Sequence, residues 1–129
     1  MPDLILIRAS DNSYHELAGN TDGHLLTSTT GDPAHEATTV TVYNISLTNA
    51  NTEYSQALPA NTRRLCFRSR TGVQVRYAWS AGKVATPTAP YQTLMAGAEY
   101  AVDDVKLAAA TLYLASATAG ATIELECWA

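Results

Sequence analysis

Charged residues are scarce in this chain of 129 residues. They make up 16% of it, while hydrophobic residues make up 47%; about a quarter of an average globular domain is charged. Much of the surface must therefore consist of Thr, Ser, Asn, Gln and Ala, which suits a surface that neighbouring proteins partly cover. The formal net charge is -4, and this argues against general nucleic-acid binding.

Cysteine is also scarce, with Cys66 and Cys127 as the two examples. Neither belongs to a CxxC motif or to a Cys/His spacing typical of metal sites. We expect two buried free thiols, because free cysteine behaves as a small apolar residue. A disulfide between the strands that carry them is the alternative.

Long hydrophobic runs are lacking as well. The run Leu4-Ile5-Leu6-Ile7 follows Met1-Pro2-Asp3 directly, and it is too short for the apolar part of a signal peptide or for a membrane span. We therefore expect no signal peptide and no membrane partner. The protein is expected to be made in the cytosol and to be kept or assembled there.

Residue patterns that carry catalysis are nearly absent. The chain has no G-x-S-x-G elbow and no phosphate-binding glycine-rich loop. Asp32, His35 and Glu36 lie close together in the sequence, but their spacing matches no recognised metal site, so an exposed loop is predicted. Glu124 and Glu126 would lie roughly 7 Å apart on one strand face, within the separation of a glycosidase pair, yet on a flat surface. We predict no enzyme, no cofactor and no metal, with a hydrolase using this pair as an alternative.

Alternating apolar and polar residues are what the sequence does contain. Residues 61–79 predict a β-hairpin whose turn is Thr71-Gly72, since glycine takes positive φ without steric cost. Strict alternation predicts one buried face and one exposed face. The predicted core face carries Leu65, Phe67, Val73, Val75, Tyr77 and Trp79, and the outer face carries Arg64, Arg68, Arg70, Gln74 and Arg76.

A second hairpin is predicted to close the chain at residues 111–128, with its turn at 118–120 and with Glu124 and Glu126 on its outer face. If the two hairpins are neighbours, these glutamates can pair with the arginines across strands. Further strands are predicted at 4–8, 24–30, 38–48, 53–58 and 91–95. Residues 14–17 form a brief strand or nothing regular, 83–90 form a loop, 99–105 are ambiguous, and a loop is preferred over a helical turn at 105–110.

This succession of short strands, with turn signals every 8–12 residues, predicts an all-β fold. We expect an antiparallel β-sandwich, jelly-roll-like, because such folds are built from many short strands of this kind. The length suits a single domain overall. Residues 1–36 would form an N-terminal strand with a polar arm, and residues 37–129 the sandwich core.

Basic residues are concentrated in the middle of the chain, where six of the eight lie between Arg63 and Lys83. This cluster is either a solvated strand face or a contact patch for an acidic partner surface. Trp128 is expected to be exposed on the face of the glutamates, where tryptophan is favoured as an interface anchor. The candidate partner contacts are Arg64, Arg68, Arg70, Arg76 and Trp128. Alternatively, surface aromatic residues form a sugar-stacking platform.

Two parts of the chain resemble small β-sandwich or jelly-roll structural proteins of tailed bacteriophages. The first part comprises residues 58–64 (LPANTRR), 67–70 (FRSR) and 73–78 (VQVRYA). The second comprises residues 111–116 (TLYLAS), 118–120 (TAG) and 123–128 (IELECW). The resemblance covers about residues 54–128, and the first fifty residues match nothing of this kind.

The resemblance implies a capsid decoration, or cement, protein that binds and stabilises the shell of the major capsid protein. Such a protein would be a homo-oligomer, either a dimer or a trimer, on the capsid surface of the virion, and would assemble in the host cytoplasm. The arginine face would meet an acidic capsid exterior, and the family has no catalytic residues to carry over. A neck, tail or fibre-associated protein and a carbohydrate-binding β-sandwich module are the alternatives.

Overall fold

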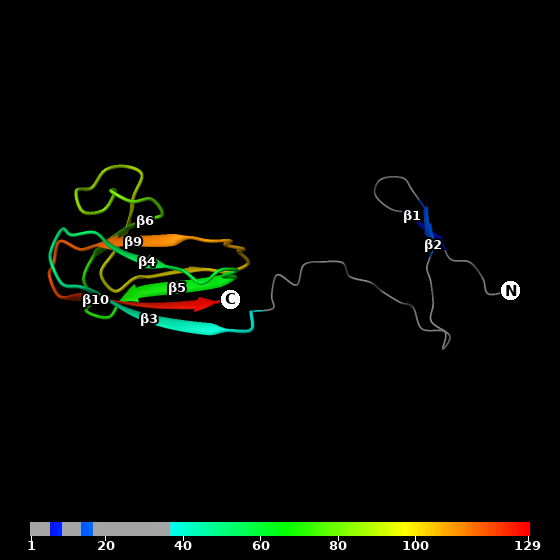
Figure 1. The fold of residues 1–129 in the computed structure, drawn as a ribbon, viewed down its shortest axis with the longest axis horizontal. Coiled ribbons are helices and arrows are strands. Elements are labelled where there is room, and N and C mark those ends of the chain that lie inside the picture. The colour runs from blue at the N-terminus through cyan, green and yellow to red at the C-terminus, as the bar shows by residue number, and fades with distance from the viewer. Residues whose placement is uncertain (1–5, 9–13, 17–36) are drawn as a thin grey trace. The chain divides into compact units, whose positions relative to one another are not determined.

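The computed structural model describes residues 6–8, 14–16 and 37–129, and the chain divides into two compact units, Met1–Asp32 and Pro33–Ala129. In the first unit, β1 (Leu6–Arg8) pairs antiparallel with β2 (Tyr14–Glu16) (Figure 1). The short strand predicted at 4–8 is thus present, and of the two alternatives left open for 14–17 the brief strand is the one found. The strand predicted at 24–30 lies outside the described residues, as do Asp32, His35 and Glu36.

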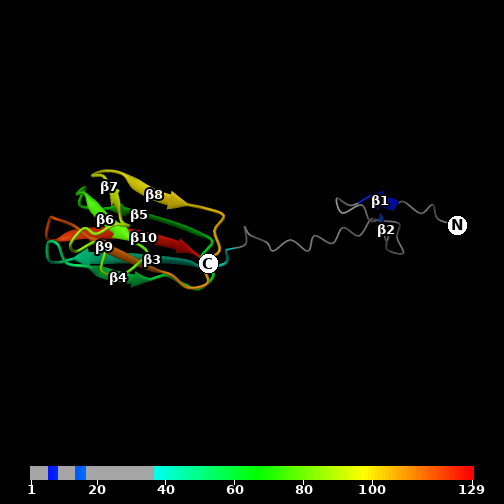
Figure 2. The same ribbon diagram turned by 90° about the horizontal axis from the view of Figure 1, so that it is seen from above.

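The second unit consists of two antiparallel sheets with four strands each. The sheet that we call the β3–β8 sheet has the order β3-β10-β5-β8, with bounds Val40–Leu47, Ala121–Trp128, Arg64–Ser69 and Glu99–Val102. The β4–β7 sheet has the order β4-β9-β6-β7, with bounds Tyr54–Ala57, Thr111–Ala115, Val75–Ala78 and Gln92–Leu94. Figure 1 shows the two layers, and Figure 2 shows them from above. The expected all-β antiparallel sandwich is confirmed, and the described residues contain no helix.

The strand pairs of this unit are nested within one another. β3 pairs with β10, β4 with β9, β5 with β8, and β6 with β7. The chain is therefore one long antiparallel ribbon whose tip is the β6–β7 connection. Each other connection between consecutive strands of this unit leads from one sheet to the other.

Both predicted hairpins are wrong as pairings. β5 and β6 belong to different sheets, and so do β9 and β10. The expected turn does occur, with Gly72 at a φ of 66°, but it carries the chain across the sandwich. Alternation reports which face of a strand is buried. Strands of both sheets bury one face in the same core, so the pattern does not distinguish a hairpin from a corner.

The faces themselves were predicted correctly within the strands. Leu65, Phe67, Val75 and Tyr77 are buried in the core between the sheets. The prediction that Trp79 is a core residue is wrong, because its side chain is 42% exposed. β6 ends one residue earlier, so the alternation no longer applies to Trp79.

The two cysteines are free thiols, as expected, but the expectation that both are buried holds for Cys127 and not for Cys66. Cys66 on β5 lies opposite Glu126 of β10, whereas Cys127 lies opposite Leu65. The two positions differ by one residue in register, and successive side chains point to opposite faces. Cys127 is accordingly buried in the core and Cys66 is half-buried on the outer face, which separates the two sulfur atoms and explains why they are unpaired.

Candidate interaction surface

The solvent side of the β3–β8 sheet, which we call the outer face, collects most of the residues predicted to contact a partner. Register places on it Val40, Val42, Asn44 and Ser46 of β3, Thr122, Glu124, Glu126 and Trp128 of β10, Arg64, Cys66 and Arg68 of β5, and Glu99 and Ala101 of β8. Arg70 follows β5 directly and is exposed on the same face. Four strands that lie far apart in sequence thus build one surface.

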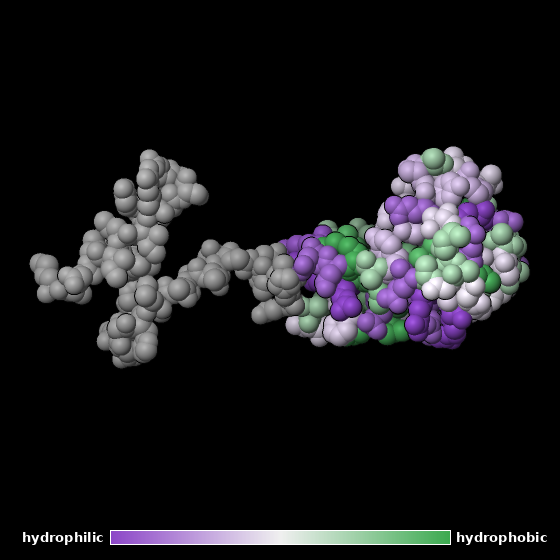
Figure 3. Space-filling view, turned by 180° about the vertical axis from the view of Figure 1, so that it is seen from behind, coloured by the Kyte–Doolittle hydropathy of each residue, from purple (hydrophilic) through white to green (hydrophobic). Residues whose placement is uncertain are grey.

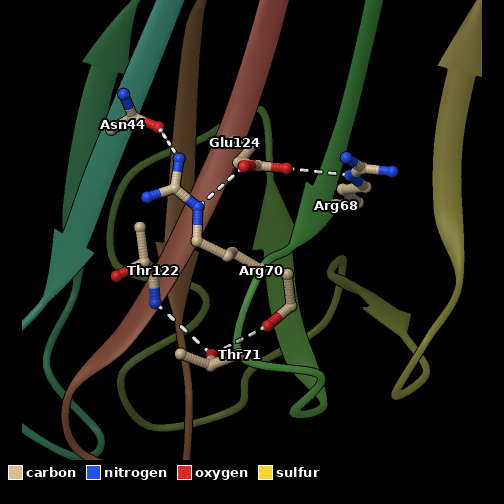
Figure 4. Close-up of polar contacts among 7 residues, drawn as sticks. Asn44, Arg68, Arg70, Thr71, Thr122 and Glu124 are labelled. Atoms are coloured by element: carbon tan, nitrogen blue, oxygen red, sulfur yellow. Dashed lines mark hydrogen bonds and ion pairs between the residues drawn. The ribbon is translucent and has the colours of Figure 1, made fainter.

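Glu124 is the centre of a charged network on the outer face (Figure 4). Arg68 Nε donates to Glu124 Oε2 at 2.9 Å, and Arg70 Nε donates to Glu124 Oε1 at 2.7 Å. Arg70 Nη2 also donates to Asn44 Oδ1 at 2.7 Å. The expected pairing of arginines with a glutamate across strands is confirmed at Glu124. It occurs because β5 pairs with β10, although neither strand belongs to the hairpin that was predicted for it.

The turn after β5 is bound to β10 beside this network. Arg70 N donates to Thr122 O at 2.9 Å, and Thr122 N donates to Thr71 Oγ1 at 3.4 Å (Figure 4). The Ser69 and Thr71 hydroxyls share a hydrogen bond of 3.1 Å. These contacts hold the backbone from which Arg70 projects, so the network is carried by a well-anchored part of the fold.

The outer face is balanced in charge and is not a basic patch. Three arginines, at 64, 68 and 70, share it with three glutamates, at 99, 124 and 126. Arg76 lies on β6 of the other sheet, where its Nη2 donates to Asn51 Oδ1 at 2.7 Å. The basic cluster of the sequence is therefore split by the fold, and its attraction for an acidic surface is reduced.

Apolar side chains border this network. Val40 is 45% exposed and Val42 is 60% exposed. Trp128 lies between Val40 and Arg64 in register, is half-buried, and donates from Nε1 to Glu126 Oε1 at 2.7 Å; its expected exposure is thus partial. A depression of about 260 Å³ beside these residues is lined by Val42, Asn44, Cys66, Arg68, Glu124 and others. Figure 3 shows hydrophobic and hydrophilic residues interspersed over the side of the sandwich that it presents.

The hydrogen bonds of Glu124 do not suit the acid of a glycosidase. A glycosidase acid needs an apolar site that keeps its carboxyl protonated. Hydrogen bonds from Arg70 and Arg68 instead lower the pKa of Glu124. This carboxylate therefore stays ionised, and both of its oxygens already accept hydrogen bonds from arginine. Among the residues described, no group of His, Cys, Asp and Glu side chains could hold a metal ion, and none forms a helix able to span a membrane.

A second surface lies at the end of β6, where the sequence pattern places Trp79 in the core instead of on the surface. Trp79 is 42% exposed and Tyr91 is 38% exposed. Both line a depression of about 210 Å³, together with Tyr77, Ala78, Ser80, Pro90 and Gln92. The Tyr77 hydroxyl donates to Gln92 Oε1. The signal available in the sequence was the Ser80-Ala81-Gly82 segment, which marks the end of the strand before Trp79 can be buried.

Comparison with protein-family models finds no matching model, and comparisons with curated proteins and with solved structures find no match either. The function proposed below therefore rests on the residues of this chain and on the geometry of its sheets.

The charged network predicts that Glu124 loses its proton at a lower pH than an unpaired glutamate does. Its folded-state pKa lies below the ordinary value, because Arg70 and Arg68 donate to the ionised carboxylate. The network's contribution to stability is therefore present above the pKa of the unfolded chain and is lost as pH falls through the folded pKa. In a carbon-detected NMR titration, we expect Arg68→Ala combined with Arg70→Ala to raise the Glu124 pKa. An unchanged midpoint would show that the arginines do not hold this carboxylate in solution.

The thiols predict selective alkylation. Burial raises the pKa of Cys127 to about 11, so at pH 8 only about one molecule in a thousand carries the thiolate. Burial also raises the pKa of Cys66, but this residue is partly accessible. Mass spectrometry after iodoacetamide treatment should show slow labelling of Cys66, no labelling of Cys127 in the folded protein, and rapid labelling of both in denaturant. Labelling of folded Cys127 as fast as Cys66 would contradict the buried site.

Proposed function

We propose that this protein is a non-enzymatic structural component of a tailed-phage virion, a capsid decoration protein that binds the major capsid protein shell as a homo-oligomer. The resemblance of residues 54–128 to such proteins motivates the proposal. The nested strand pairs support it, because a ribbon rolled into two four-stranded sheets is what a jelly roll, a common fold of viral shell proteins, would require.

The observation that carries the proposal is the composition of the outer face. Protein interfaces combine aromatic residues and arginine with apolar groups, and charges at their centre are few. The row of Val40, Trp128 and Arg64 has this composition. Beside it, the charges of Arg68 and Arg70 are already paired with Glu124. A rigid, largely self-neutralised sheet face of this kind suits docking onto a shell.

The composition of purified virions from the source phage tests this function. Quantitative mass spectrometry would score the copy number of this chain against that of the major capsid protein. We expect a copy number comparable to that of the shell subunit. A few copies per particle would assign the chain to the neck, tail or fibres, and absence from the particle would overturn the virion function.

Shell binding should depend on the arginines of the outer face. Replacing Arg64, Arg68 and Arg70 together by alanine removes three charges from this face, so we expect weaker binding to undecorated shells, most clearly at low salt. Arg76→Ala is the matched control, because Arg76 lies on the other sheet. Equal binding by the triple variant and the wild type would remove the arginines from the contact.

A carbohydrate-binding module is the second candidate, and the exposed pair of Trp79 and Tyr91 favours it. Aromatic faces next to an amide such as that of Gln92 are suited to stacking and hydrogen bonding with a sugar ring. A glycan array with the wild type and with Trp79→Ala would decide. A glycan retained by the wild type and lost by the variant supports the module, and an array without any bound glycan excludes it.

A further inference from the structure

The free edge of β3 is the least protected part of the sandwich unit. β3 has eight residues, Val40–Leu47, and stands at the end of its sheet, where β10 is its sole partner among the described strands. An edge strand presents a row of unpaired backbone N–H and C=O groups, which can template pairing with another chain.

The backbone groups that face this edge can be assigned from the ladder. Thr39 N donates to Ala129 O at 2.9 Å, and Ala129 N donates to Thr39 O at 2.9 Å, so Thr39 forms a hydrogen-bonded pair with β10's end. Such pairs alternate with non-hydrogen-bonded pairs along an antiparallel ladder. The N–H and C=O groups of Val40, Val42, Asn44 and Ser46 therefore point toward the free edge, and the side chains of the same residues are exposed.

The other three edges of the sandwich are short or carry charge. β7 has three residues, and β4 and β8 have four each. β8 also carries Glu99. Native proteins protect edges with short strands, charged side chains, proline or bulges. β3, with the sequence VTVYNISL, is long and has no charge and no proline, and its pairing with β10 is continuous, without a bulge.

We propose that β3 pairs antiparallel with β3 of a second copy, forming a continuous eight-stranded sheet around a two-fold axis. Antiparallel pairing of one edge with itself is self-complementary, as a two-fold interface requires. The absence of charge on β3 means that no like charges meet across the axis, whereas pairing through β8 would bring two copies of Glu99 together. Where the two strands overlap along most of their length, the exposed Val42 of each copy then lies beside Asn44 or Ser46 of the other copy. One long free edge per copy closes the assembly at two.

The dimer adds an assembly state to the proposed virion function. Only its location, on the capsid surface, depends on that proposal. The outer faces of the two copies would join into one surface that presents Trp128 and Arg64 twice. The dimer can be tested in the purified protein without any shell. Its failure would leave the virion copy number unaffected, so the two proposals can fail separately.

Sedimentation velocity of the full chain over a range of concentrations tests the dimer. Val42→Pro is the decisive variant, because the Val42 N–H faces the free edge and its loss breaks no hydrogen bond within one copy. We expect Val42→Pro and Val42→Lys to weaken dimerisation by about tenfold or more while circular dichroism stays native. Thr93→Lys is the matched control, since it adds the same charge on the exposed edge strand β7 and should leave the dimer intact.

Amide hydrogen exchange in the same samples identifies which strand forms the contact between the two copies. The amides of Val42 and Asn44 should be protected in the dimer and should exchange rapidly in Val42→Lys. A wild type that stays monomeric at several hundred micromolar would overturn the proposal, as would a dimer that persists in both Val42 variants. Protection of these amides in a monomer would also overturn it, because a segment of the same chain would then cover the edge.

Discussion

Replacing Phe67 by alanine will lower the free energy of unfolding of the sandwich unit by about 4 kcal/mol. Phe67 is 1% exposed and lies at the centre of the core. Its ring meets Tyr77 edge-on, with 5.1 Å between centroids and 79° between planes, and lies 5.1 Å from the tilted ring of Tyr100. The three rings come from β5, β6 and β8. Removing the central ring would leave a cavity and remove the contact of Phe67 with Tyr77 across the two sheets, while the contact between Tyr77 and Tyr100, with centroids 5.3 Å apart, would remain.

Chemical denaturation followed by circular dichroism measures this effect. In a domain of 60–100 residues, 1 kcal/mol corresponds to about 4–8 °C in Tm, so the melting temperature should fall by roughly 15–30 °C. Phe67→Leu should cost less because it fills part of the cavity. Thr93→Ala, at an exposed position, should stay within about 0.5 kcal/mol of the wild type. A Phe67→Ala variant within about 1 kcal/mol of the wild type would contradict the close packing of this ring in the core.

Replacing Glu53 by alanine will open the loop after β6, at a cost of about 2 kcal/mol. The Glu53 carboxylate accepts hydrogen bonds from three successive backbone N–H groups, those of Gly82, Lys83 and Val84, at 2.8, 3.1 and 3.3 Å. Val84 is fully buried in a small cluster beside Ala78 and Ala115. Without the carboxylate, these donors lose their partner and the buried side chain loses its anchor.

Hydrogen exchange separates this local opening from global unfolding. The amides of residues 82–84 should exchange faster in Glu53→Ala, while those of β5 and β10 follow global stability. Glu53→Gln should have a smaller effect because one oxygen remains as an acceptor. Glu99→Ala, which removes an exposed carboxylate on β8, is the control. Unchanged exchange at residues 82–84 in Glu53→Ala would refute the anchoring role.

The Glu53→Ala variant also distinguishes the two candidate functions. Residues 82–84 lie between Trp79 and Tyr91, the two exposed aromatic residues of the second surface. If that surface binds a glycan, Glu53→Ala should weaken glycan binding, because the same substitution opens the loop between the two aromatic residues. If the outer face of the β3–β8 sheet docks onto a shell, the same variant should leave docking unchanged, because Glu53 belongs to neither the outer face nor the Glu124 network.

The candidate contacts illustrate how far sequence reasoning reached. Placing Arg64, Arg68 and Arg70 on an outer face required only their spacing in one extended segment. Placing Arg76 on the same face required a hairpin, and β6 instead joins the other sheet. Glu124 was predicted to lie on an outer face, but its position opposite Arg68 depends on β5 and β10 being neighbours.

The all-β class, most strand positions and the buried face of each long strand follow from the residue pattern along the chain. These are local properties, because side chains alternate with a period of two and apolar residues must leave water. Which strands pair, the exposure of Trp79 and the burial of Val84 depend instead on how distant segments pack together. Pairing joins segments as distant as Asn44 and Glu124, and it is set by how the whole ribbon buries its apolar face in one core, which no local pattern records.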